Sequence, residues 1–197
     1  MMKRIRLLFA ILLMLVSNVS LLAQNTESGL RGMLESRDQE IKELVGPEGT
    51  TYTQEQRDNL KDMINGIVDF HAMAAFALGD TYESITDEQR TEFVDLFSTI
   101  IRDGSLNNLD IYRANISYDS ITIEENKAKV ETTAELKNVK TPVHYDMEYK
   151  NDEWVITDLI IDDVSTSKSY QRSFRRTLRR NGFEALLNNL RKRASGE

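Results

Sequence analysis

Two histidines are the first candidates for acid–base chemistry in this sequence, because histidine titrates near neutral pH. His71 stands within the apolar segment FHAMAAFAL, and His144 alternates with Asp146 and Glu148 in VHYDMEY. Alternation places His144, Asp146 and Glu148 on one solvated side of a strand, beside lysines. In such a place the two carboxylates have no reason for a raised pKa. We interpret His71 as a hydrogen-bonded histidine of the core. We interpret His144, Asp146 and Glu148 as part of a solvent-exposed face of the sheet.

The motifs of nucleophilic, metal and phosphate chemistry are missing from the sequence. There is no cysteine, so thiol chemistry, disulfides and lipid attachment through cysteine are excluded. No nucleophile elbow, phosphate loop, dinucleotide fingerprint or metal-spaced histidine cluster is present. We therefore expect a non-catalytic protein without a metal or cofactor.

Arginines form the clearest pattern, in SYQRSFRRTLRRNG near the C-terminus. At 100° per residue, a helix here has an apolar side opposite a cationic side. The apolar side contains Tyr170, Phe174, Thr177 and Leu178, and we expect it to cover the sheet. The cationic side, the arginine row, consists of Arg172, Arg175, Arg176, Arg179 and Arg180. This row is either a solvated face or a docking surface for anionic lipid or an acidic partner.

Charge is distributed unevenly along the chain. Residues 168–197 contain nine basic and two acidic residues, a net charge of +7, whereas residues 24–167 have a net charge of −17. A basic patch on so acidic a molecule is poorly suited to nucleic acid, which the remaining surface would repel.

The first residues have the layout of an export signal. Lys3, Arg4 and Arg6 precede ten apolar residues, 7–16, and small or polar residues follow to Ala23. The apolar run is too short to be a permanent membrane span. We predict a signal peptide over residues 1–23 and a single exported domain over 24–197, located in the periplasm.

Helices are expected up to the region around Gly104, strands after Tyr112, and a further helix at the C-terminal end. Leu60, Met63, Ile64, Ile67 and Val68 share one helical stripe, FHAMAAFAL predicts a buried helix ended by Gly79, and Thr86 with Gln89 predicts a capping box. Residues 115–161 alternate with period two between the turn signals EEN, KN and KND, which predicts four antiparallel strands. A change of register predicts a bulge near Asp119 and Ser120.

Three segments of the chain resemble the signature regions of the MlaC family. They are VDFHAMAAFALGDTYESITDEQRTEFVDLF, DEWVITDLIIDDVS and SYQRSFRRTLRRNGFEALLNNL. The shared positions are Leu78, Gly79, Thr86, Gln89, Arg90, Phe93, Phe97, Trp154, Asp158, Val164, Ser165, Tyr170, Phe174, Gly182 and Leu190.

The resemblance implies a periplasmic phospholipid shuttle. Such a protein holds phospholipid by its acyl tails and exchanges it with two membrane complexes. One is an outer-membrane lipoprotein and porin complex, and the other is an inner-membrane ABC transporter with an MCE-domain ring.

Together, these patterns predict an α+β fold of the NTF2-like type. A curved four-stranded antiparallel sheet would be covered by helices, with an apolar cavity between them. The candidate cavity wall consists of Phe93, Phe97, Val130, Val143, Tyr145, Met147, Trp154, Ile156, Tyr170 and Phe174.

Two other function classes remain open from the sequence. Curved sheets with covering helices also house isomerases and hydratases, and an apolar groove can bind a protein partner in a structural adaptor. An ordinary hydrophobic core would also place apolar residues at each of the candidate wall positions.

Overall fold

A computed structural model describes residues 26–106 and 109–196. The predicted signal peptide lies outside these residues. The helices before the sheet are α2 (Glu27–Val45), α3 (Gln54–Ile67), α4 (Phe70–Leu78), α5 (Asp80–Ser84) and α6 (Asp87–Leu106), followed by the 3₁₀ helix η1 (Leu109–Arg113). In the described part of the chain, no helix combines the length and apolar character needed to cross a membrane.

The strands form one antiparallel sheet in the order β1-β2-β3-β4-β5. They are β1 (Asn115–Glu124), β2 (Lys127–Leu136), β3 (Val139–Lys150), β4 (Glu153–Ile161) and β5 (Val164–Ser165), and α7 (Thr166–Ser195) follows directly. The α+β class with an antiparallel sheet is therefore confirmed, but the prediction of four strands was wrong. The fifth strand has only two residues, too few to show any alternation in sequence.

Tight turns join neighbouring strands as the turn signals predicted. Lys137 and Asn138 have φ of 51° and 65°, and Asn151 and Asp152 have φ of 52° and 66°. Asn and Asp tolerate these left-handed angles better than most residues, and two consecutive positive φ values suit the twist of a hairpin. The Asp162–Asp163 pair makes the same kind of turn before β5.

Short sequence motifs also determine where α6 begins, where α4 ends and where one bulge lies in the sheet. The amide of Gln89 donates to Thr86 Oγ1 at 3.3 Å, and the amide of Thr86 donates to Gln89 Oε1 at 3.0 Å, so the predicted capping box is confirmed. Gly79, at φ 57°, ends α4. The pairing of β1 with β2 shifts between Tyr118 and Ser120, which confirms the predicted bulge.

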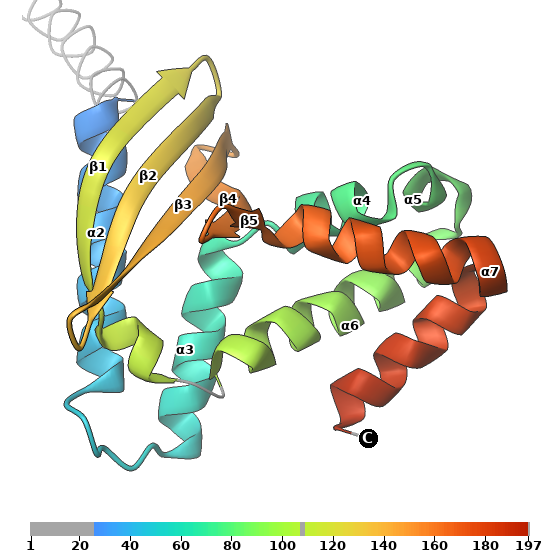
Figure 1. The fold of residues 1–197 in the computed structure, drawn as a ribbon, viewed down its shortest axis with the longest axis horizontal. Helices are drawn as coiled ribbons and strands as arrows, with labels where there is room; N and C mark the ends of the chain where they lie inside the picture. The colour runs from blue at the N-terminus through green and yellow to red at the C-terminus, as the bar shows by residue number, and fades with distance from the viewer. Residues whose placement is uncertain (1–25, 107–108, 197) are drawn as a thin grey trace, which may run out of the picture.

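The helices form two groups (Figure 1). Helix α2 runs along the sheet on one side, and α4 to α7 stand together on the other side of α3. Only the start of α7 lies near the sheet. The helix then bends at Gly182, whose φ of 80° and ψ of 178° are not helical.

The expected packing of α7 against the sheet was wrong. Its rings contact α6 instead: the centroids of Tyr170 and Phe97 are 4.9 Å apart, and those of Phe174 and Phe93 are 5.7 Å apart. The physical reason lies at the start of the helix. Strand β5 turns the chain back beside β4, and Asp158 on β4 accepts a 2.9 Å hydrogen bond from the amide of Ser167. These contacts lead α7 away from the sheet.

Candidate functional site

One face of the sheet is apolar across its central strands. Val130 on β2 pairs with Ile121 on β1 and with Tyr145 on β3. The next row of the same face pairs Ala128 with Met147, and Met147 with Ile156. Because side chains alternate along a strand, these rows point to the same side of the sheet. They form a continuous apolar surface.

Helix α2 packs on part of this surface. Leu30 is fully buried and Leu34 is nearly so, in one cluster with Ile121, Val130 and Met147. We call this the sheet cluster. Its buried members are Leu30, Leu34, Ile121, Ala128, Val130, Met147, Trp154 and Ile156. The sequence reasoning missed α2, although Thr26 caps the helix and Leu30, Met33 and Leu34 have helical spacing.

The apolar face becomes more exposed toward the β2–β3 turn. Val143 pairs with Thr132, which is fully buried, and with Ile161, which is 42% exposed. Val143 itself is half-buried, and Val139 near the end of the face is 64% exposed. The face therefore has a covered end near Trp154 and an open end near Val143.

A second group of buried residues, the helical cluster, lies between α4, α6 and α7. Phe93 and Phe97 are fully buried and their rings stack at 5.6 Å. Phe174 meets both rings nearly edge-on, and Tyr170 closes the group. This edge-to-face packing is a favourable arrangement of aromatic rings.

The predicted wall residues thus divide between two clusters. Val130, Met147, Trp154 and Ile156 are buried in the sheet cluster, with Tyr145 packed against it. The aromatic residues Phe93, Phe97, Tyr170 and Phe174 belong to the helical cluster. Val143 stands at the open end of the sheet face. A sequence pattern shows which side chains are apolar, but not which of the two clusters they join.

The α3–α4 junction connects the two clusters. Val68 packs against both of them and forms an isolated parallel bridge with Ile156. Asp69 is the residue that follows Val68. Its carboxylate accepts a hydrogen bond from the amide of Ala72, which caps α4, and forms an ion pair with Lys150 on β3. Burial raises the pKa of Asp69, but the hydrogen bonds from Lys150 and Ala72 outweigh it and leave the pKa below its usual value.

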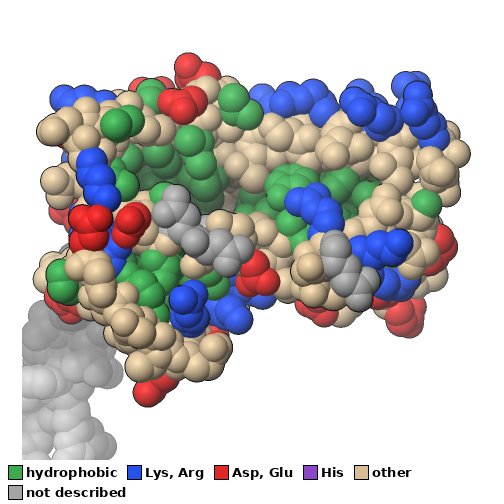
Figure 2. All heavy atoms as spheres, turned by 60° about the horizontal axis from the view of Figure 1, so that its bottom comes forward, with side chains coloured by type: hydrophobic (Ala, Val, Ile, Leu, Met, Phe, Trp, Pro, Cys, Tyr) green, Lys and Arg blue, Asp and Glu red, His purple; other side chains and the backbone are tan. Residues whose placement is uncertain are grey.

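Apolar side chains are recessed on the face shown in Figure 2. One hollow lies on the side of the sheet and α3, and a second apolar area lies on the side of α6 and α7. Residues with intermediate exposure border the sheet cluster: Met33, Ile67, Tyr118, Ile123, Tyr145 and Tyr149. Burial raises the pKa of Tyr145 to about 12.

The histidines do not meet at this apolar face. His71 is exposed on α4, so its interpretation as a core residue was wrong. The period of α4 places it on the solvent side of an otherwise apolar segment. His144 pairs with Glu131 and Ile160 on the opposite side of the sheet, and its Nδ1 accepts from the amide of Thr132 at 3.3 Å.

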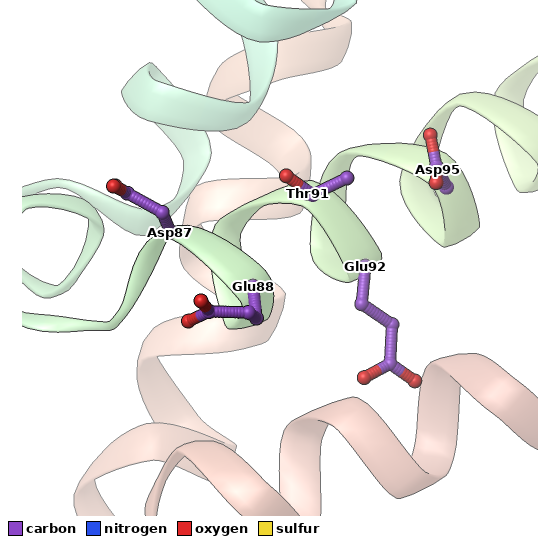
Figure 3. Close-up of a pocket in the computed structure, with 5 residues that line it drawn as sticks. All are labelled: Asp87, Glu88, Thr91, Glu92 and Asp95. Carbon is purple, nitrogen blue, oxygen red and sulfur yellow. The ribbon is translucent and has the colours of Figure 1, made fainter.

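A shallow depression on the outside of α6 is acidic (Figure 3). It is lined by Asp87, Glu88, Thr91, Glu92 and Asp95. Glu92 points toward α7 and accepts from Arg191 at 2.6 and 2.9 Å, and Asp87 accepts from Arg90 at 2.8 Å. Within the described residues, no cluster of side chains is suited to hold a metal ion. These carboxylates instead stabilise the helix start and the α6–α7 contact.

Comparison with known proteins places this fold among relatives. A protein-family model described as "MlaC protein" matches residues 35–192. A search of curated proteins finds no match. A solved phospholipid-binding protein from Ralstonia solanacearum, in complex with a phospholipid, has a similar structure with a TM-score of 0.72. The two chains are 16% identical, and the match covers 87% of this chain and 98% of the other. At this identity, the likeness concerns the fold.

Proposed function

Because this chain belongs to the MlaC family, we propose that it binds a phospholipid by its acyl chains on the apolar face of the sheet. The observation that carries this proposal is the gradient along that face. Its covered end is closed by α2, whereas its open end exposes apolar side chains around Val143. The Ralstonia phospholipid-binding protein, which has a similar fold, adds support.

The energetics of lipid transfer require an apolar site. A diacyl phospholipid contains about 30 methylene groups, each worth about 0.8 kcal/mol when removed from water, so exposing both tails costs on the order of 20 kcal/mol. A protein that carries such a lipid must cover most of the tails. We propose that Tyr145, Val143 and the half-buried rim of the sheet cluster contact them. The rings of Phe93, Phe97 and Phe174 fill the space between the helices.

We further propose that the protein is a non-catalytic shuttle in the periplasm. It would exchange phospholipid with an outer-membrane lipoprotein and porin complex and with an inner-membrane ABC transporter that has MCE domains. The predicted signal peptide and the family membership support this assignment. The placement of both histidines away from the apolar face favours a binding protein over an isomerase or hydratase.

Purification without detergent tests lipid binding. The protein is expressed in a bacterial host with its export signal, purified from the periplasm and extracted with organic solvent, and the extract is analysed by mass spectrometry. We expect phospholipid in near-stoichiometric amount. An empty extract from protein with a cooperative thermal transition would refute the proposal and favour an adaptor that binds a protein partner.

A further inference from the structure

The described basic residues differ sharply in whether they have an acidic partner. Ion pairs occupy Arg31, Arg37, Lys42, Lys61, Arg90, Arg113, Lys129, Lys137, Lys140, Lys150 and Arg191. Arg57, Lys127, Lys168, Lys192 and Arg193 have no ion pair with a described residue, and the same holds for the whole arginine row on α7. All five of its side chains are exposed, and none forms an ion pair with a described residue.

The arginine row forms an extended edge of the molecule. Arg172, Arg175 and Arg179 follow one another at helical spacing along the part of α7 before Gly182, with Arg176 and Arg180 beside them. Figure 2 shows lysine and arginine side chains projecting along the edge formed by this helix. The opposite side of the helix is anchored through Phe174, which is buried. The row is therefore held on a packed element.

An exposed aromatic residue borders this edge. Phe76 on α4 is 44% exposed, although the sequence predicts a helix buried on all sides. Its carbonyl oxygen accepts a 2.8 Å hydrogen bond from Gln171, which lies one turn before Arg175. Phe76 thus lies next to the beginning of the arginine row. Exposed aromatic side chains beside cationic ones are typical of surfaces that lie in a membrane interface.

We propose that the arginine row and Phe76 form a docking surface for an anionic phospholipid membrane. The guanidinium groups would contact lipid phosphates, and Phe76 would enter the boundary between head groups and acyl chains. Two observations favour a membrane over an acidic protein. The cations follow a helix ridge, which suits a broad, laterally uniform surface, and an exposed apolar side chain accompanies them.

Charge also determines the orientation of docking. Residues 24–167 have a net charge of −17, so an anionic bilayer repels most of the molecule and attracts α7. The acidic depression on α6 would be repelled in the same way. The docked protein would therefore present one defined edge to the bilayer. This inference does not depend on lipid cargo, because the arginines belong to neither apolar cluster.

Vesicle sedimentation tests this surface with matched variants. One variant combines Arg175→Gln, Arg176→Gln and Arg179→Gln, and its control combines Lys127→Gln, Lys129→Gln and Lys140→Gln, which removes the same charge from the sheet. Glutamine has nearly the helix propensity of arginine, so α7 is preserved. The probes are vesicles of phosphatidylglycerol mixed with phosphatidylcholine, and vesicles of pure phosphatidylcholine.

We expect the parent to bind only the anionic vesicles, and added salt to weaken binding. The arginine variant should lose about a hundredfold in partitioning, because each of the three basic residues contributes about a factor of five at an anionic surface. Phe76→Ala should lose several-fold, and the lysine control should bind like the parent. Circular dichroism verifies that each variant is folded. Mass spectrometry of the extracted lipid verifies that its lipid cargo is unchanged.

Three results would overturn the proposal: no vesicle binding by the parent, equal binding to both vesicle types, or equal losses in the arginine variant and its lysine control. A parent that ignores vesicles but binds an acidic protein through these arginines would assign the surface to a protein partner. If the purified parent carries no lipid cargo but still docks on anionic vesicles through α7, the proposed function is refuted and the docking proposal stands.

Discussion

The backbone N–H of Asp69 donates a 2.9 Å hydrogen bond to the carbonyl oxygen of Ile156. This bond joins the start of α4 to β4 at the place where Val68 contacts both apolar clusters. The Asp69 carboxylate strengthens the junction by pairing with Lys150 on β3. The helical cluster is thus tied to the sheet by a charged contact as well as by packing.

Asp69→Asn tests this contact through the pH dependence of stability. The pKa of Asp69 is lower in the folded protein than its usual value of 3.8, so its stabilising effect is present above that pH and is lost as the pH falls below it. Asparagine can still cap α4 but cannot pair with Lys150. We expect the variant to lose about 1 kcal/mol at pH 7, since Lys150 is partly solvated.

Urea unfolding at pH 7 and pH 3 measures this difference. The parent should lose more stability than Asp69→Asn between the two values, and the two curves should converge at the lower pH. Parallel loss in both proteins would show that the Asp69 carboxylate contributes nothing specific to the junction.

The bend in α7 predicts a large effect at a glycine. Gly182 has φ 80° and ψ 178°, a combination accessible essentially to glycine alone. A Cβ atom at this position would meet no atom within 4 Å, so any cost comes from the backbone. Gly182→Ala should destabilise the protein by about 1–3 kcal/mol. Gly32→Ala, at an uncrowded position inside α2, is the control and should stabilise by up to about 1 kcal/mol.

Thermal unfolding of both alanine variants gives the comparison. If Gly182→Ala unfolds at the parent's temperature, α7 can pass position 182 without the bend, and the packing of its second half on α6 does not require glycine.

Sequence patterns predicted those features that depend on neighbouring residues. The Thr86–Gln89 capping box, the bulge at Asp119 and the hairpin turns each need only a few consecutive side chains, so their signals are local. The same patterns missed β5, which is too short for alternation, although Asp162–Asp163 is a turn signal.

The packing of residues far apart in the chain could not be predicted from patterns of neighbouring residues. The apolar side of α7 fits a sheet or a helix equally well, and only the contacts of β5 and Asp158 direct it to α6. The grouping of Phe97 with Tyr170, and of Val130 with Leu30, therefore appears only in the fold. The exposure of Phe76 and His71 likewise depends on which side of α4 meets α7.

Val143→Trp provides the site-specific test of the lipid proposal. At the half-buried open end of the sheet face, an indole can occupy space that the acyl chains would otherwise fill. We expect a folded protein with reduced lipid. Val130→Trp is the matched control on the same face: Val130 is fully buried, so overpacking should cost about 1–3 kcal/mol or more.

Native mass spectrometry of the intact parent, purified without detergent, measures the central claim most directly. We predict that the folded ion carries the additional mass of a phospholipid, and that Val143→Trp shifts the population to the lipid-free mass while retaining a folded charge-state distribution. A parent found in its folded state only at the lipid-free mass would contradict lipid binding. Full lipid occupancy in folded Val143→Trp would contradict the placement of the acyl chains at the open end of the sheet.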